Sequence, residues 1–321
     1  MPSCSGRRRL LVAGLGLLGL TGCAVQTAAL LGRRRDEMAG LPRQAELTET
    51  PFFPQEQRYL CGPETLAAVM HAAGLPVTPA ELQPEVYLPG RQGSLQVEML
   101  AAARRHGAVA VLLPPELPAV FREVAAGTPV LILQNLALPM APTWHYAVVV
   151  GYDLDRETVL LRSGHERRQE MRMRTFEHTW ARSRHWAFVA LPPGRLAASA
   201  TEVETTQALI AFERVAPAPA AELAYAVAAD RWPHSLTLQM GRGNTLYAAG
   251  RKVEASAVFA GVARQHRSAA AWINHGSVEL ELGRRAQARE AARQALALGG
   301  SWAPQARALM AKVGAENGDG P

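Results

Sequence analysis

Cysteine is scarce in this chain, whose 321 residues include only Cys4, Cys23 and Cys61. So few cysteines cannot build a disulfide framework, which excludes the small disulfide-rich class of exported domain. Cys4 and Cys23 belong to an N-terminal export signal described below, so Cys61 would be the single free thiol of the mature chain. A leftover thiol in an exported protein indicates either a reactive role or a buried structural one, and the count alone does not separate the two.

The chain also lacks a membrane-spanning segment and a nucleic-acid-binding composition. The apolar run Leu10–Leu20 is shorter than the about 20 residues that a spanning helix needs. The formal net charge of +6 includes three arginines next to that run, and no basic run is interleaved with aromatic residues. Nucleic acid is therefore not expected as a partner. With 48% hydrophobic and 19% charged residues, the chain is globular and long enough for two modest domains.

The N-terminus has the pattern of a bacterial secretory signal. Three arginines at positions 7–9 precede the apolar run, which ends in Leu20-Thr21-Gly22-Cys23. That ending resembles a lipobox, which implies cleavage after residue 22 and diacylation of Cys23; an ordinary signal peptide is the alternative. The residues after Cys23 are Ala-Val and not aspartate, which by resemblance to lipoprotein sorting rules favours the outer membrane, with the protein anchored at its periplasmic face. Residues 23–50 show no sustained periodicity and are interpreted as a tether.

Residues 51–193 change from helical to strand-like patterning part of the way along. Helical periodicity predicts helices over 61–74, from Thr78 as N-cap, over 94–106 and over 117–126. After Gly127, short β-branched and aromatic runs predict strands over 129–134, 145–152, 158–161 and 186–191, with a short helix over 176–183. A helical half followed by a strand-rich half, without βαβ alternation, predicts an α+β domain.

A linker at 194–203 separates this domain from an alanine-rich, helical region over 204–315. Six residues of this region recur after 33 positions: Gly243, Gly250, Arg251, Ala255, Phe259 and Val262 become Gly276, Gly283, Arg284, Ala288, Ala292 and Ala295. The pattern resembles tetratricopeptide repeats, with Trp272 at the leading aromatic position, although the usual proline is absent and Glu279 replaces a common aromatic. The resemblance implies capture of a protein partner or peptide; ordinary helical hairpins are the alternative.

Three residues suggest acyl-transfer chemistry. Cys61 opens an apolar helix in Cys61-Gly62-Pro63, where the helix N-terminus favours a thiolate. Gln55 lies six positions upstream, where its side-chain amide could stabilise an oxyanion, with Gln57 as a rival. His145 opens a strand whose other positions are apolar, so its ring faces either the core or a cleft. Together they are the parts of a cysteine-nucleophile site.

These segments, with the run Val148-Val149-Val150-Gly151-Tyr152-Asp153 that follows His145, resemble the papain-like cysteine peptidases of the bacteriocin-processing, double-glycine leader type. The resemblance covers residues 51–193 and implies a papain-like fold. It also implies Cys61 as nucleophile, His145 as base and then acid, and Gln55 in the oxyanion hole. Where the family carries an aspartate that orients the histidine, alignment through Gly151 and Tyr152 places Ser163.

The sequence therefore predicts a lipid-anchored periplasmic cysteine peptidase that hydrolyses a peptide or protein, with a helical-repeat domain for partner or substrate capture. No cofactor or metal is expected. Serine at position 163 can orient an imidazole but cannot stabilise its charge as a carboxylate does, so a catalytically idle scaffold lipoprotein is the alternative. An acyltransferase or amidase that uses the same pair of residues would differ only in its substrate.

Overall fold

The computed structural model describes residues 38–55, 57, 59–138 and 140–315. The chain divides into two compact units, Met1–Arg43 and Gln44–Pro321. Of the first unit only residues 38–43 are described, where the amide of Leu41 donates to the carbonyl of Met38. The expected export signal and Cys23 therefore lie outside the described residues. Among the helices that are described, none combines the length and apolar character that crossing a bilayer requires.

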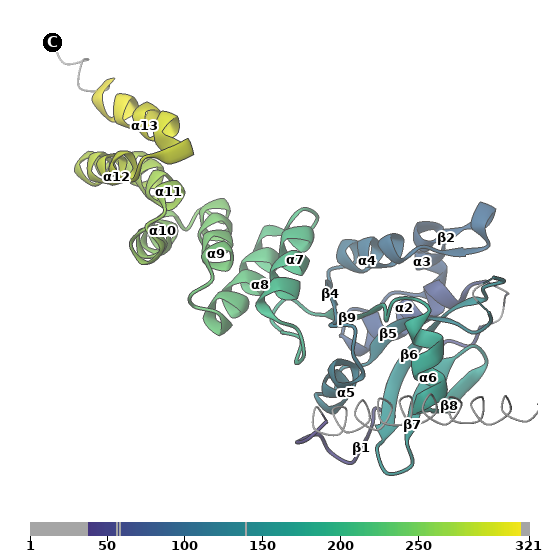
Figure 1. Ribbon diagram of the computed structural model, residues 1–321. Helices are drawn as coiled ribbons and strands as arrows, with labels where there is room; N and C mark the ends of the chain where they lie inside the picture. Colours follow the sequence, from purple (N-terminus) through teal and green to yellow (C-terminus); the bar gives the residue numbers. More distant parts are fainter. Residues whose placement is uncertain (1–37, 56, 58, 139, 316–321) are drawn as a thin grey trace, which may run out of the picture. The chain divides into compact units, whose positions relative to one another are not determined.

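A seven-stranded antiparallel sheet forms the centre of the first part of the second unit (Figure 1). Its strands are β1 (Gln44–Glu46), β4 (Val109–Leu112), β5 (Val130–Asn135), β6 (Trp144–Asp153), β7 (Thr158–Ser163), β8 (Glu166–Arg172) and β9 (Ala187–Leu191). They are ordered β4-β9-β5-β6-β7-β8, and β1 pairs with the end of β6. Every residue of β5 and β9 is buried, as expected for apolar strands covered on both faces.

Helices α2 (Cys61–Ala72) and α4 (Gln96–Arg105) pack on this sheet, and α3 (Pro79–Val86) packs against both of them. Leu66 and Met70 of α2 join Leu131 of β5 and Val148 of β6 in one buried cluster. Helix α3 begins as its sequence predicts, because Thr78 and Glu81 form a capping box. A two-stranded ribbon of β2 (Tyr87–Leu88) and β3 (Gly93–Ser94) joins α3 to α4.

Two further helices, α5 (Leu117–Ala125) and α6 (Met173–Ala181), also contact the sheet. Phe121 of α5 stacks on Tyr152 of β6 at 4.5 Å between ring centroids. Leu133 of β5 packs toward α2. The next residue, Gln134, faces the other side of the sheet and donates to Thr179 of α6 over 2.6 Å. The sheet is thus covered on both faces, and the predicted α+β class is confirmed.

Three strands of the seven-stranded sheet do not appear in the sequence pattern, and neither does the short β2–β3 ribbon. Strand β4 precedes α5, within the part expected to be helical, and β8 consists largely of charged residues and lies at the sheet edge. Strand β1 lies within the expected tether, because Gln44–Glu46 pairs with Gly151–Asp153 of β6. The structured domain therefore begins before residue 51.

Seven helices follow: α7 (Glu202–Glu213), α8 (Ala218–Arg231), α9 (Leu236–Ala248), α10 (Lys252–His266), α11 (Ala269–Glu281), α12 (Arg285–Leu298) and α13 (Ala303–Ala315). This region is all-helical, as predicted. Helices α11 and α12 begin 33 residues after α9 and α10, respectively. A Cβ atom on Gly243 would lie 2.4 Å from the Phe259 ring, so α9 and α10 approach closely because this position is glycine.

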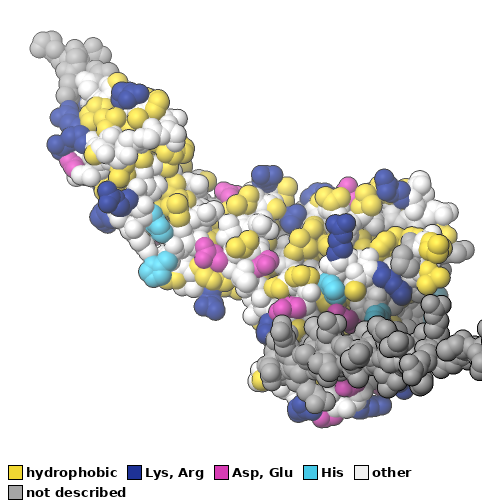
Figure 2. All heavy atoms as spheres, viewed as in Figure 1, with side chains coloured by type: hydrophobic (Ala, Val, Ile, Leu, Met, Phe, Trp, Pro, Cys, Tyr) yellow, Lys and Arg dark blue, Asp and Glu magenta, His cyan; other side chains and the backbone are white. Residues whose placement is uncertain are grey.

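Glu279, which replaces an aromatic residue of the repeat pattern, is buried but has polar partners. Ser256 of α10 donates to its carboxylate over 2.5 Å and contacts His275 Nδ1 over 2.7 Å, while Arg284 lies 3.4 Å away. The buried charge is therefore compensated across three successive helical segments. Over the part of the surface not covered by grey atoms, Figure 2 shows acidic, basic and apolar side chains interspersed, consistent with the modest net charge.

Candidate active site

Cys61 is the first residue of α2, and close packing fixes this helix start. Pro63 lies in the first turn, where an amide hydrogen would have no helical partner. A Cβ atom on Gly62 would lie 2.2 Å from Ser94 Oγ, so glycine is required for the approach of β3. Thr65 Oγ1 donates to the Cys61 carbonyl over 2.6 Å, which holds the first turn in place.

Burial raises the pKa of the half-buried Cys61 thiol above its ordinary value. The nearby Glu64 carboxylate, itself buried in the first turn of α2, raises the pKa further. Backbone N–H groups of Tyr146, Cys61 and Gly62 act in the opposite direction, because they stabilise a thiolate. The net direction is upward, so the resting thiol is protonated near neutral pH.

His145 and Ser163 are brought together from neighbouring strands. His145 is the second residue of β6 and Ser163 ends β7, and a hydrogen bond of 3.0 Å joins His145 Nε2 to Ser163 Oγ. Burial lowers the pKa of His145, since removal from water disfavours the charged imidazolium. A neutral imidazole is the form that can accept a proton from a thiol.

Gln55 lies beside the residue that follows Ser163. Its backbone amide donates to the Gly164 carbonyl over 3.0 Å, and its side-chain Nε2 donates to the Gln57 carbonyl over 3.2 Å. The amide expected to bind an oxyanion is therefore hydrogen-bonded to the backbone here. The rival Gln57 is exposed, and its carbonyl also accepts from the Leu60 amide.

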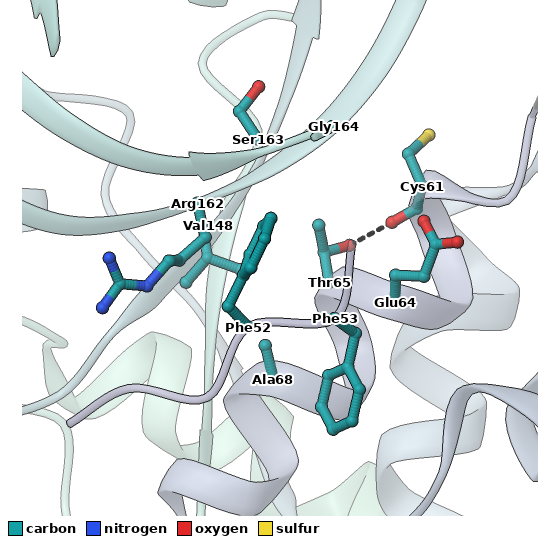
Figure 3. Close-up of a pocket in the computed structure, with 10 residues that line it drawn as sticks. All are labelled: Phe52, Phe53, Cys61, Glu64, Thr65, Ala68, Val148, Arg162, Ser163 and Gly164. Carbon is teal, nitrogen blue, oxygen red and sulfur yellow. Dashed lines mark hydrogen bonds between the residues drawn. The ribbon is translucent and has the colours of Figure 1, made fainter. Parts of the chain in front are cut away.

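Cys61 and Ser163 line one small pocket, with Phe52, Phe53, Glu64, Thr65, Ala68, Val148, Arg162 and Gly164. Figure 3 shows the Cys61 sulfur at the end of α2 and the Ser163 hydroxyl at the end of β7 pointing toward the same side. The pocket volume of 10 Å³ holds about one water molecule. Within the part of the chain that the structure describes, no hydrogen bond joins the Cys61 sulfur to the His145 ring.

Arg162, next to Ser163, is a buried charge that the sequence reasoning missed. It is 4% exposed, and its guanidinium donates to three backbone carbonyls, those of Thr48, Thr50 and Arg167. These bonds tie the segment after β1 to β7 and β8. An arginine within an otherwise apolar strand was the signal that could have revealed it.

Two contributors to the electrostatics of Cys61 were also missed. The amide of Tyr146 reaches the sulfur from β6, directly after His145. Glu64 follows the Cys61-Gly62-Pro63 motif by one residue, and its effect on the thiol could have been inferred from helical spacing. The Tyr146 amide required knowledge of the packing of α2 on β6.

Comparison with known proteins identifies the fold of the first domain. Residues 47–188 match the model of the Peptidase_C39 like family. Among solved structures, a protein described as a C39-like peptidase from Bacillus anthracis is similar at 18% identity and a TM-score of 0.38, covering 46% of this chain and 97% of that chain. A double glycine motif protease from an AMS/PCAT transporter, in complex with a leader peptide, is similar at 18% identity and a TM-score of 0.34, covering 45% and 93%. No curated protein matches the chain. The N-terminal part therefore has the papain-like C39 fold, followed by an all-helical region.

Proposed function

We propose that this protein is a cysteine peptidase in which Cys61 is the nucleophile, His145 the proton acceptor and donor, and Ser163 the residue that orients His145. The observation that carries the proposal is the meeting of α2 and β6. The backbone N–H of Tyr146, which lowers the pKa of the Cys61 thiol, follows His145 directly on β6, and His145 is held by Ser163 over 3.0 Å. A nucleophile at a helix start, beside a strand that carries a neutral histidine, suits acyl transfer.

The reaction proceeds in two stages. The sulfur attacks the peptide carbonyl carbon while the thiol proton passes to His145, and the carbonyl oxygen becomes an oxyanion. When the C–N bond breaks, His145 returns the proton to the departing amine and a thioester remains. Water then attacks the thioester carbonyl carbon as His145 takes its proton. The C–S bond breaks, the acid leaves, and His145 returns the proton to the sulfur, which restores the thiol. The backbone N–H groups at Cys61 and Gly62 are donors suited to the oxyanion, with Gln55 as a further donor once its amide leaves the Gln57 carbonyl.

The second candidate is a catalytically idle domain that serves as a scaffold. Specific observations favour it: the pKa of the Cys61 thiol is raised, the pKa of His145 is lowered, and serine instead of a carboxylate contacts the imidazole. All three work against a thiolate–imidazolium pair.

Labelling with a peptide-like thiol-reactive probe separates the two candidates. For a peptidase, His145→Ala should slow labelling of Cys61 by about 100-fold or more, the contribution typical of a general base. His234→Ala, which changes a histidine on the helical region, is the matched control and should leave the rate unchanged. Equal labelling of wild type and His145→Ala would mean that the histidine does not activate the thiol, and the peptidase proposal would fail.

We further propose that lipidation of Cys23 holds the protein at the periplasmic face of the outer membrane and that the tetratricopeptide-like helices capture a partner or substrate. The lipobox pattern and the 33-residue recurrence of α9–α10 in α11–α12 support these proposals. Metabolic labelling with a radioactive fatty acid tests the first: incorporation should be lost in Cys23→Ser and kept in Cys4→Ser. Incorporation in Cys23→Ser would contradict lipidation at this residue.

A further inference from the structure

The loop between β5 and β6, residues 136–143, is unusual for its exposed apolar side chains. Leu136, Leu138 and Met140 are 45%, 64% and 90% exposed, and Trp144 at the start of β6 is 51% exposed. These are four of the six exposed large hydrophobic side chains among the described residues of 51–193. The sequence from Leu136 to Trp144 contains no charged residue. Several exposed apolar side chains gathered on one loop indicate a contact site.

The base of this loop is held by hydrogen bonds. The buried side chain of Asn135 accepts from the amides of Ala137 and Thr143 over 3.1 and 2.9 Å. The amide of Leu136 donates to the Thr143 carbonyl over 2.9 Å. Arg182, at the end of α6, donates to the carbonyls of Asn135 and Ala137 over 3.0 and 2.7 Å. The apolar side chains are therefore presented from a fixed base, which lowers the entropy cost of binding.

The loop continues directly into the candidate active site. Trp144 is followed by His145, which contacts Ser163, on the strand that packs against the helix α2 beginning at Cys61. Trp144 is adjacent to His145, the proposed proton acceptor, and a strand advances about 3.3 Å per residue. The exposed apolar side chains therefore begin next to the candidate site. The loop therefore lies at the end of β6 that carries His145.

We infer that the loop defined by Leu136, Leu138, Met140 and Trp144 binds the substrate, and that the substrate class is an extended polypeptide with large, uncharged apolar side chains beside the scissile bond. The inference rests on the proposed peptidase function for its location, whereas the docking itself requires no chemistry. The side chains of the loop carry no charge, so burying a charged substrate side chain against them would cost desolvation. Burial of aliphatic side chains on the loop supplies the affinity.

Binding can be measured without catalysis in the full chain carrying Cys61→Ala. The probes are two fluorescein-labelled 12-residue peptides of equal charge, one with leucine and one with serine at alternate positions, followed by fluorescence anisotropy. The leucine peptide should bind at least about tenfold more tightly than the serine peptide. Leu138→Ser with Met140→Ser should reduce that preference by about fivefold or more. Val203→Ser with Val253→Ser, which removes two exposed apolar side chains of the helical region, is the matched control and should retain it.

An unchanged preference in Leu138→Ser with Met140→Ser would overturn the inference. The inference would also be overturned if Leu138→Ser with Met140→Ser kept the preference for the leucine peptide but lost binding to phosphatidylcholine–phosphatidylglycerol vesicles. The loop would then contact lipid and not substrate. Alkylation of Cys61 by iodoacetamide in the same loop variant, with Cys61 restored, should match wild type, since neither substituted residue lines the pocket at Cys61. If His145→Ala does not slow the labelling of Cys61, the proposed peptidase function alone is refuted. A loss of the leucine preference in Leu138→Ser with Met140→Ser would still support docking of a polypeptide on the loop.

Discussion

Ser163→Asp should make Cys61 more reactive near neutral pH. The ordinary pKa values of a thiol and an imidazole, about 8.5 and about 6.5, leave at most about 1% of such pairs as thiolate and imidazolium. Burial raises the pKa of Cys61 and lowers that of His145, so both shifts reduce this fraction further. A carboxylate would act on that balance directly, because Ser163 Oγ already lies 3.0 Å from His145 Nε2.

The size of the effect follows from this distance. Two unit charges about 4 Å apart attract by about 4 kcal/mol at an effective dielectric constant of about 20, and desolvation of the half-buried carboxylate removes part of that gain. The net preference for the imidazolium should therefore increase by about 10- to 1,000-fold. A carboxylate also only accepts hydrogen bonds, so it fixes the proton on Nε2 and leaves Nδ1 as the base, whereas a serine hydroxyl can donate or accept.

The assay is the rate of iodoacetamide alkylation between pH 5 and 10, read by mass spectrometry of the peptide that carries Cys61. In wild type the rate should rise only at alkaline pH, as the thiol with its raised pKa ionises. Ser163→Asp should add reactivity at neutral pH, by about tenfold or more. Ser163→Asn has nearly the same volume without the charge and should resemble wild type. Superimposable profiles for Asp and Asn, or a neutral-pH plateau in wild type, would refute the reasoning.

Three other predictions concern the start of α2. Gly62→Ala should lower the free energy of unfolding, measured in urea, by about 1–3 kcal/mol, because its Cβ would lie 2.2 Å from Ser94. Gly90→Ala is the control and should change this free energy little, since the space around Gly90 is open. Equal effects of the two substitutions would contradict the packing argument. Glu64→Gln should lower the pKa of the Cys61 thiol and speed alkylation at pH 8 by about two- to fivefold, and a slower reaction would contradict the assigned sign. The Cys61 thiol keeps its proton to a higher pH in the folded chain than in the unfolded chain. Above about pH 8.5 the free energy of unfolding of wild type should therefore fall by about 1.4 kcal/mol per pH unit relative to Cys61→Ala, until the folded thiol ionises. If urea denaturation gives the two chains the same pH dependence from pH 8 to 10, this linkage is absent.

Local chemistry explains which parts of the fold the sequence could predict. Thr78 and Glu81 specify a helix start through their own side chains, and the structure contains that capping box. Strand β9 and the first four residues of β5 are apolar, so their burial follows from their composition. Strands β1 and β8 were missed because edge strands need not be apolar, and pairing with β6 or β7 holds them through the backbone.

The candidate site divides in the same way. Residue types and order suggested Cys61 and His145, and alignment with the family pattern added Ser163; the structure joins His145 and Ser163 by a hydrogen bond. The direction of each pKa shift depends on burial and on the approach of the Tyr146 amide, which are properties of packing. Neither can be read from spacing along the chain, because residues 61 and 146 come together only when α2 packs on β6.

Arg162 has a consequence for how the chain tolerates cutting. Its guanidinium donates hydrogen bonds to the Thr48 and Thr50 carbonyls and so joins that segment to β7, the strand that ends in Ser163. A protease that cuts the backbone between β1 and residue 50 would free the segment that carries these carbonyls. The buried guanidinium would then lack hydrogen-bond acceptors, at a cost in stability. The orienting partner of His145 would then lose its support, although the cut lies about a hundred residues away in sequence. Cleavage near the N-terminal end of this domain would therefore disturb the candidate site without any change to the cysteine or the histidine.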